Sequence, residues 1–456
     1  MIRLRRESRR LALCMLVAGM LPLLAACSSG DEGEFIAWDP PTIEAPVLTP
    51  TAIPASPTSL PVMSTDVPAS PEVPPAPAST SSPTTMTATA ATPSTVANAS
   101  KLTSEELKTY QPNEIGWIPV MEYHVITTDP AGEADQFVRT ADHMREDLQF
   151  LYDHDFYVIP MRELVRNEIT APPGKHPVVL TFDDATASQF RWDDAGGERV
   201  IDPETALGVL ETFFAEHPDF GKGGFFAVLP NNCFADGTKY NTMDDCTDKL
   251  VWLAENGYEV GLHTLDHQDM LNVSDEEFMR QIGGDALWVD ERVQGPGNMS
   301  RVLALPFGNY PDREKHPEQR RMMREGFTYN GVEIKLEGAL MVGANPTESP
   351  SSATYDPIFI ARIQAFKDSL DLWFPQFASG AVSLYTSDGN PDVISVPSEI
   401  AGDLDGQFDA DLIIASGKEL VQYDAETGTV ATRSREILDA PRAEVQHHAW
   451  RPERWV

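Results

Sequence analysis

The chain has 456 residues and a formal net charge of −36 at pH 7. This length allows two domains together with non-globular sequence. A protein this acidic is not expected to bind nucleic acid through the phosphate backbone, because such binding depends on Lys and Arg. The composition therefore argues against nucleic acid as a partner.

Residues 1–26 have the features of an export signal. Several arginines precede an apolar run at residues 11–26, and the run ends in the sequence LAAC at residues 24–27. The run is shorter than the roughly 20 residues of a membrane-spanning helix and is typical of a signal peptide. Its end resembles the lipobox of bacterial lipoproteins. This resemblance implies that Cys27 is lipidated and anchors an extracytoplasmic protein to the membrane surface. An ordinary signal peptide with an incidental cysteine is the alternative.

Residues 27–100 are predicted to be a disordered linker. The segment is rich in Pro, Ser, Thr and Ala, and no Lys or Arg occurs between Arg10 and Lys101. Such a composition cannot bury a hydrophobic core and favours extended, partly polyproline II conformations. The linker would hold a folded domain well away from the membrane.

Residues 101–380 are predicted to form an α/β domain. Apolar strands alternate with amphipathic helices, and the strand at residues 178–182 is continuously apolar, as in a buried parallel sheet. The alternation predicts a mostly parallel sheet with functional residues at the carboxyl ends of its strands. The expected strands lie at 117–124, 156–159, 178–182, 224–229, 258–262 and 301–305, and the expected helices at 140–153, 206–214, 249–255 and 275–291, the last with Ser274 as N-cap.

Two motifs at predicted strand ends carry metal-binding chemistry. Asp183 and Asp184 follow the strand at 178–182, and His263 and His267 follow the strand at 258–262. One carboxylate and two imidazoles form a facial ligand set for a divalent transition metal. The second carboxylate is then free to act as a general base beside the metal. The alternative is that all four are ordinary polar residues at strand ends.

Cys233 and Cys246 are predicted to form a disulfide, because export would place them in an oxidising compartment. They flank a polar stretch without periodicity. Closing that loop would stabilise the fold by roughly 3 kcal/mol in the chain-entropy model. Two free thiols or a zinc-binding pair are the alternatives.

Residues 381–456 are predicted to be a small β-rich appendage or tail. Turn-rich stretches at 388–391 and 402–406 lie among short apolar runs. The runs at 393–396 and 412–414 are predicted to be short strands. The Asp-x-Asp-Gly sequence at 403–406 could bind calcium, although such a stretch is more often a solvated turn.

Three motifs in order resemble the polysaccharide deacetylases of carbohydrate esterase family 4, which share the NodB homology domain. They are the Thr-Phe-Asp-Asp strand end at 181–184, the His-Thr-x-x-His sequence at 263–267 and the Leu-Pro-Phe-Gly sequence at 305–308. The resemblance implies a distorted (β/α) barrel. It also implies that Asp183 is the catalytic base and that Asp184, His263 and His267 bind a divalent metal, with zinc expected first and cobalt or nickel as alternatives.

An early histidine, His124, is the expected general acid. The sequence at 121–126 resembles the Tyr-His strand near the start of a subgroup that includes exported poly-N-acetylglucosamine deacetylases. In that subgroup the motif order is permuted, and this histidine replaces a late Leu-x-His motif, which is not found in this chain. An amine leaving group needs a proton donor. The alternative is a strand-end histidine bonded to backbone.

The resemblance also implies which residues contact the substrate. The third motif and the aromatic residue after it are expected at the substrate site, and two tryptophans are further candidates for an aromatic wall. These residues are Pro306, Phe307, Gly308 and Tyr310, with Trp288 and Trp373 as the further candidates.

The chain departs from the common family pattern at two positions. An Arg that orients the base usually lies two residues before the Pro of the third motif, where this chain has Ala304. Arg301 or Arg362 could replace it. Ala185 stands where Gly usually follows the Asp pair.

The residues and the resemblance together predict a membrane-anchored enzyme that hydrolyses N-acetyl groups of an extracellular or cell-wall polysaccharide of the N-acetylglucosamine type. The polysaccharide and, through the lipid anchor, the membrane are the expected partners. An O-acetyl esterase acting on a xylan-like glycan and a non-catalytic glycan-binding lipoprotein are the alternatives. The retention of Asp183 argues against the second, because binding alone needs no base.

Overall fold

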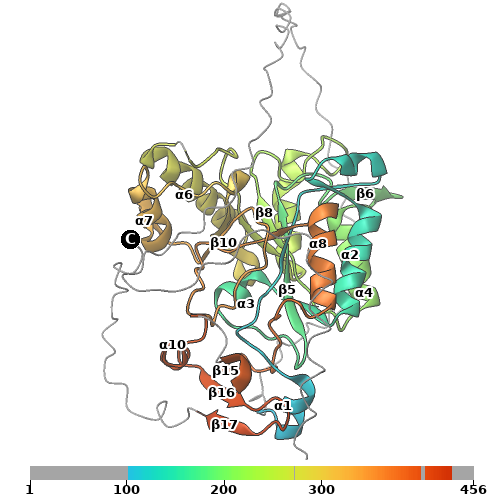
Figure 1. The fold of residues 1–456 in the computed structure, drawn as a ribbon. Coiled ribbons are helices and arrows are strands. Elements are labelled where there is room, and N and C mark those ends of the chain that lie inside the picture. Colours follow the sequence, from blue (N-terminus) through green and yellow to red (C-terminus); the bar gives the residue numbers. More distant parts are fainter. Residues whose placement is uncertain (1–100, 272, 402–405, 434–456) are drawn as a thin grey trace, which may run out of the picture. The chain divides into compact units, whose positions relative to one another are not determined.

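The computed structural model describes residues 101–271, 273–401 and 406–433, and Figure 1 shows their ribbon. The predicted signal peptide and linker, with Cys27, lie outside these residues, as do Asp403 and Asp405 of the candidate calcium stretch. No helix in the described ranges combines the length and the apolar character that a membrane crossing requires.

A parallel sheet forms the centre of the fold. Its strands run in the order β13-β10-β9-β8-β5-β1-β14, and β4 pairs with the start of β5. Every one of these pairings is parallel. The strands are β1 (Val120–Tyr123), β4 (Phe156–Val158), β5 (His176–Asp183), β8 (Phe225–Val228), β9 (Glu259–Leu262), β10 (Asn298–Ala304), β13 (Gly338–Leu340) and β14 (Ile363–Gln364).

The two ends of this sheet meet. Leu340 at the end of β13 forms a parallel bridge with Ile360. The amide of Met341 donates to the carbonyl of Ile360, and the amide of Ile360 donates to the carbonyl of Ala339, both at 2.9 Å. Ile360 leads directly into β14, which pairs with β1. The curled parallel sheet confirms the predicted distorted (β/α) barrel.

Helices pack against the outside of the sheet, and Figure 1 shows α2 and α4 side by side on one flank. Several of them begin at capping residues that the sequence supplies, because Thr140, Thr205 and Ser274 each accept a backbone hydrogen bond in the first turn. The helices are α2 (Ala141–Asp153), α3 (Met161–Val165), α4 (Ala206–Glu216), α5 (Cys246–Glu255), α6 (Asp275–Arg292), α7 (Pro317–Glu325) and α8 (Lys367–Ala378).

Alternate residues of the central strands face two different cores. In β5, Leu180 and Phe182 pack toward the helices, whereas Val179 packs in the barrel interior with Phe225 of β8. Successive side chains of a strand point to opposite faces. Asp183 therefore follows Val179 on the interior face of the barrel.

A second, smaller sheet follows the barrel in the order β15-β16-β17, and its presence confirms the predicted β-rich C-terminal region. The strand predicted at residues 412–414 is wrong, because these residues lie in α10 (Ala410–Ala415). Asp409 accepts hydrogen bonds from the amides of Asp411 and Leu412 and so starts a helix. A short apolar run fits either a helix or a strand, and here the cap decides.

Hydrogen bonds join this second sheet to the start of the described chain. The hydroxyl of Tyr423 donates to the carbonyl of Pro112 at 3.0 Å, and Ile115 packs in a small core with Ile394 and Val396. The remaining elements are α1 (Ser104–Tyr110), β2 (Val125–Thr127), β3 (Val138–Thr140), β6 (Trp192–Ala195), β7 (Glu198–Ile201), β11 (Phe327–Tyr329), β12 (Val332–Ile334), β15 (Val393–Pro397), α9 (Ser398–Ala401), β16 (Glu419–Tyr423) and β17 (Val430–Arg433).

Candidate active site

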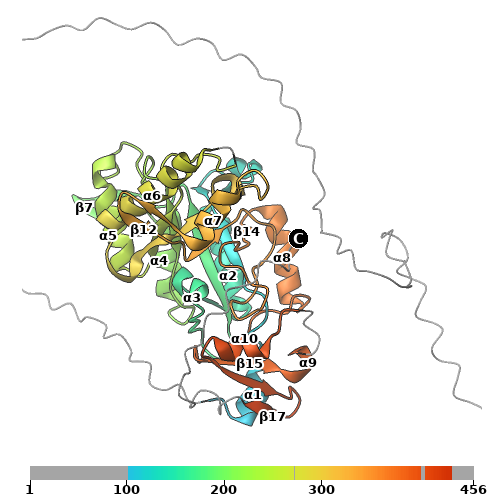
Figure 2. The ribbon, with the colours of Figure 1, turned by 90° about the vertical axis from the view of Figure 1, so that its left-hand side faces the viewer.

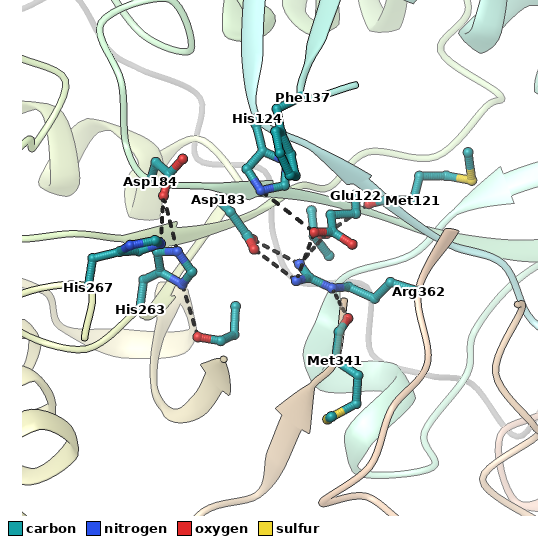
Figure 3. A network of polar contacts seen from close by, with 12 residues as sticks. Met121, Glu122, His124, Phe137, Asp183, Asp184, His263, His267, Met341 and Arg362 are labelled. Carbon is teal, nitrogen blue, oxygen red and sulfur yellow. Dashed lines mark hydrogen bonds and ion pairs between the residues drawn. The ribbon is translucent and has the colours of Figure 1, made fainter. Parts of the chain in front are cut away.

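Asp184, His263 and His267 meet at the carboxyl ends of β5 and β9. The Oδ1 atom of Asp184 lies 3.1 Å from Nε2 of His263 and 3.4 Å from Nε2 of His267. Figure 3 shows both imidazoles directed at this one carboxylate oxygen. The structure therefore brings together the three residues that the sequence predicted as metal ligands.

The hydrogen bonds of His263 indicate that this cluster suits a cation. Its Nδ1–H donates to the carbonyl of Ala304 at 2.9 Å, so in the neutral ring the lone pair of Nε2 faces the carboxylate of Asp184. Two acceptors this close need a proton or a metal ion between them. Burial disfavours the charged ring, but Asp184 and Asp183 outweigh it and raise the pKa of His263. The donor set fits a divalent transition metal such as zinc.

The backbone around these ligands adopts conformations that L-residues rarely use. Asp184, Thr264 and His267 have φ values of 81°, 67° and 53°. Such residues persist only where the surrounding structure holds them, and they concentrate at functional sites. Ala185 also has a positive φ, of 51°, a conformation that glycine adopts without a steric penalty.

Buried side chains hold this backbone in place. The carboxylate of Asp285, on α6, accepts a hydrogen bond from the amide of His263 at 2.9 Å, and the side chain of Asn232 donates to the carbonyl of Asp184 at 3.0 Å. Asn232 belongs to the loop after β8, where the structure joins Cys233 to Cys246 by a disulfide. The cross-linked loop therefore supports the turn that presents Asp184.

Asp183 forms a buried, bidentate ion pair. Its Oδ1 and Oδ2 accept hydrogen bonds from Nη1 and Nη2 of Arg362, each at 2.8 Å, and neither side chain is more than 1% exposed. Arg362 also donates through Nε to the carbonyl of Met341 at 2.7 Å. Burial alone would raise the pKa of Asp183, but the charge of Arg362 outweighs it and holds that pKa well below its ordinary value.

The structure thus identifies which arginine contacts the expected base. Arg301 instead lies against Asp290, with 3.1 Å between Nη2 and Oδ2. Ala304 packs in the barrel interior, and Arg362 enters the site from the segment just before β14. Gly343 makes the approach feasible, because a Cβ atom there would lie 2.1 Å from the carbonyl oxygen of Arg362.

His124 and Glu122 complete the site beside Asp183. Nε2 of His124 lies 3.6 Å from Oε1 of Glu122, which in turn lies 3.3 Å from Nη2 of Arg362 (Figure 3). Burial raises the pKa of Glu122 to about 7 and lowers that of His124. Glu122, His124 and Asp183 are close enough to hold a metal ion, but the guanidinium of Arg362 already supplies the positive charge there.

The residues predicted to contact the substrate differ in exposure. Pro306, Phe307 and Gly308 form the 3-10 turn η4, where the Phe307 ring is 60% exposed and lies 4.7 Å from the ring of His267. Tyr310 is buried. The guanidinium carbon of Arg320 lies 4.3 Å from the centre of its ring, and the ring of Phe359 lies 5.4 Å from it, centre to centre.

Two tryptophans were further candidates for the aromatic wall. Trp288 packs under Arg292 at 4.3 Å. The indole N–H of Trp373 donates to the carbonyl of Ala344 at 2.9 Å. Of the expected aromatic residues, Phe307 has contact with a histidine of the cluster and a largely exposed ring.

Sequence reasoning missed Phe137 and Glu122. Phe137 is 41% exposed, and its ring lies 5.0 Å from that of His124. It precedes β3 in a segment without a motif, so no signal marked it. Glu122 lies on the same face of β1 as Val120, inside the barrel, and strand periodicity could have identified it as a buried charge.

Comparison with known proteins supports the reading of the motifs. The model of the family described as Polysaccharide deacetylase matches residues 170–322, which include the Asp pair, both histidines and the third motif. His124, Glu122 and Arg362 lie outside the matched residues. The comparison with curated proteins gives no match.

Several solved structures show a likeness to the chain. The Streptococcus pyogenes deacetylase PplD is 16% identical, with 55% of this chain and 93% of that chain covered and a TM-score of 0.40. IcaB from Ammonifex degensii is 18% identical, with 58% and 97% covered and a TM-score of 0.39. A de-N-acetylase from Aggregatibacter actinomycetemcomitans is 13% identical, with 54% and 93% covered and a TM-score of 0.36.

Proposed function

We propose that this chain, which carries a polysaccharide deacetylase domain and is therefore a hydrolase of amide bonds, removes N-acetyl groups from an N-acetylglucosamine-type polysaccharide outside the cytoplasm. The observation that carries the proposal is the pairing of two units at one end of the barrel. One is the Asp184, His263 and His267 cluster, and the other is the ion pair of Asp183 with Arg362.

The first unit would hold a divalent metal, with zinc expected first and cobalt or nickel as alternatives. Asp184, His263 and His267 are its ligands in this proposal, and Ala304 and Asp285 hold His263 in position. A metal ion bound there would polarise the acetyl carbonyl and make water acidic enough to be deprotonated near neutral pH.

Asp183 is the proposed general base. A base must be ionised at the operating pH, and the two hydrogen bonds from Arg362 keep this buried carboxylate charged. The same bonds fix its orientation, because a bidentate guanidinium leaves a carboxylate little rotational freedom. Asp183 would thus take the proton of the attacking water without having to reorient.

His124 is the proposed general acid, which would donate a proton to the leaving amine. It lies beside the base, and a nitrogen of its ring is within 4.8 Å of a carboxylate oxygen of Asp183. At 3.6 Å its Nε2 is too far from Glu122 for a good hydrogen bond, so a substrate nitrogen could displace that contact. This assignment follows the early Tyr-His strand of the permuted subgroup.

Two exposed aromatic rings support a sugar as the substrate. Phe137 lies against His124, the proposed acid, and Phe307 lies against His267, a proposed metal ligand. Flat rings bury the apolar C–H faces of a pyranose. An O-acetyl esterase would use the same residues, and the assay below separates the two reactions.

The proposal also places the enzyme at a membrane surface. Lipidation of Cys27 would anchor it, and the segment at 27–100 would serve as a spacer. Cys27→Ala is expected to release the protein from the membrane fraction or to block its processing. A variant that fractionates and migrates like the wild type would contradict the anchor.

The test of the activity uses the full-length protein with zinc or cobalt, and with chitooligomers, peptidoglycan, poly-N-acetylglucosamine and acetylated xylan as substrates. Asp183→Asn is expected to lower turnover by roughly 10²–10⁴-fold while metal stays bound. Asp184→Ala is expected to lose stoichiometric metal in elemental analysis, whereas Asp193→Ala, on the exposed β6, keeps both metal and turnover. Metal content that Asp184→Ala leaves unchanged would refute the ligand assignment.

A further inference from the structure

A cavity lined by residues outside the proposed active site opens beside the barrel. Its volume is about 510 Å³, and four aromatic side chains line it: Trp117, Tyr355, Phe359 and Trp373. The proposed metal ligands, base and acid are not among its lining residues. Cavities of roughly 300–1,000 Å³ with aromatic walls and a few polar groups are typical small-molecule sites.

The aromatic rings come from three separate segments that the barrel closure brings together. Trp117 precedes β1, Tyr355 and Phe359 precede β14, and Trp373 lies on α8, which packs beside β14 (Figure 2). The hydrogen bond from Trp373 to Ala344 fixes that indole ring, while Phe359 is 50% exposed. The walls are therefore partly preorganised and partly open to a ligand.

Polar groups in the cavity have free hydrogen-bonding capacity. Tyr355 lines the cavity with its ring, since its hydroxyl is buried away from solvent. Gln376 donates through Nε2 to the carbonyl of Leu372, and its side-chain oxygen Oε1 can accept a further hydrogen bond. Glu348 accepts from Thr354 at Oε2, at 2.7 Å, and leaves Oε1 for another donor.

We propose that this cavity binds a saccharide unit of the polysaccharide, at a distance from the unit that reacts. A pyranose ring offers apolar C–H faces to Trp117 and Phe359, and its hydroxyl groups both donate and accept. The half-exposed oxygens of Glu348 and Gln376 can accept from such hydroxyl groups. The proline-rich linker of this chain would also suit the aromatic rings, but each proline lacks an N–H, so a proline-rich segment offers fewer donors than a sugar with several hydroxyl groups.

Neighbouring residues link the cavity to the proposed active site. The ring of Phe359 lies 5.4 Å from that of Tyr310, two residues after the η4 turn that presents Phe307. Ala361, another lining residue, directly precedes Arg362, the partner of Asp183. A polymer that occupies both places binds the second one intramolecularly, which raises its overall affinity without new contacts. This inference rests on the proposed polysaccharide substrate.

The test measures binding of an N-acetylglucosamine hexamer to full-length protein that carries Asp183→Asn, so that the probe is not consumed. Trp117 and Trp373 line the cavity, so tryptophan fluorescence should change on binding. Phe359→Ala is expected to weaken hexamer binding by roughly 3–10-fold, the loss of one aromatic contact. Asn345→Ala, which removes an exposed polar lining side chain, should weaken it as well.

Leu372→Ala is the matched control, because Leu372 is 56% exposed on the same helix as Trp373 and does not line the cavity. It should bind the hexamer like the parent protein. With Asp183 restored, Phe359→Ala should hydrolyse a monomeric acetylated substrate at the parent rate and lose efficiency on the polymer.

The outcomes separate this inference from the proposed function. Hexamer binding that both Phe359→Ala and Asn345→Ala leave unchanged would overturn the inference, even if the enzyme deacetylates the polymer. Displacement of the hexamer by a peptide with the sequence of residues 66–77 would also overturn it, because the cavity would then belong to the linker. Binding that these variants weaken, in a protein that deacetylates no glycan, would support the cavity and refute the proposed function.

Discussion

The proposed active site and the junction between the barrel and the C-terminal sheet each bury a pair of carboxylates. In the active site, Asp183 and Glu122 lie on either side of the Arg362 guanidinium. At the junction, the pair is Glu114 and Asp388. Glu114 accepts hydrogen bonds from the hydroxyl of Tyr385 at 2.9 Å and from the backbone amides of Asp388 and Ser395. A guanidinium contacts the first pair directly, whereas the hydrogen bonds that Glu114 accepts come from neutral donors.

The two environments shift the pKa values of Asp183 and of the junction carboxyl groups in opposite directions. At the junction, burial raises the pKa of Glu114 well above its ordinary value and that of Asp388 to about 6. Arg362 holds the pKa of Asp183 far below that range, although Asp183 is equally buried. Burial therefore does not by itself make a base. The guanidinium keeps Asp183 ionised, and without it the carboxyl would resemble those of the junction.

The largest expected effect comes from removing this guanidinium. Arg362→Met leaves Asp183 and Glu122 buried without a counter-charge, and breaking a buried ion pair costs roughly 3–5 kcal/mol of stability. Turnover should fall by roughly 10²–10⁴-fold, because the base would take up a proton. Arg362→Lys is the control, since it retains the charge but loses the bidentate geometry. Its turnover should lie between that of the wild type and that of Arg362→Met. Steady-state kinetics and urea unfolding provide the measurements. Near-normal turnover in Arg362→Met would remove the distinction between the two sites.

Arg362 also shows where sequence reasoning stops. The Asp pair, the two histidines and the third motif are local patterns, and strand ends predicted their common location. Arg362 lies 179 residues from Asp183 along the chain, and their contact depends on how the barrel closes between β13 and β14. The spacing of residues carries no information about that closure, so Arg301 remained an equal candidate until the fold was known.

Other parts of the site differ in the same way. The interior position of Glu122 follows from the period of two along β1, whereas Phe137 reaches His124 from a segment that has no pattern. The strand predicted at 412–414 failed because Asp409 caps a helix there. Local rules thus give most of the elements and the motif residues, and tertiary closure supplies the partners of those residues.

The second prediction concerns the junction. In Asp388→Asn the amide oxygen can still accept from the amide of Asn390, and its N–H can donate to the Ser395 hydroxyl. The variant removes a buried charge next to Glu114, so we expect stability at pH 7.5 to rise by on the order of 2 kcal/mol. Urea unfolding of the variant and the wild type measures the change. A loss of stability would show that the junction, like the active site, needs its charges.

The third prediction is the pH dependence of that difference. Because the folded-state pKa of Asp388 is raised from 3.8 to about 6, the folded state binds more protons than the unfolded state between these values. The contribution of protonated Asp388 to folding stability is present at low pH and is lost as the pH rises through about 6. The advantage of Asp388→Asn over the wild type should therefore shrink by on the order of 1 kcal/mol between pH 7.5 and pH 5. An advantage that grows as the pH falls would reverse the sign of the argument.

The smallest expected effect concerns Glu122, the second carboxylate of the active site. Its Oε1 lies 3.3 Å from Arg362, whereas both oxygens of Asp183 lie at 2.8 Å. Glu122→Gln keeps the shape, and the ion pair of Asp183 remains, so turnover should fall by less than roughly 10-fold. Glu259→Gln is the control. Glu259 is a buried carboxylate at the start of β9 that pairs with Arg162, so this variant should change stability and leave turnover unchanged.

The ratio of the two active-site variants then decides which carboxylate the guanidinium serves. If Arg362 acts chiefly by keeping Asp183 ionised, Arg362→Met is far more damaging than Glu122→Gln. Equal losses in kcat would instead mean that Glu122 orients His124 for proton donation, and that Arg362 acts on the acid through Glu122 as much as on the base.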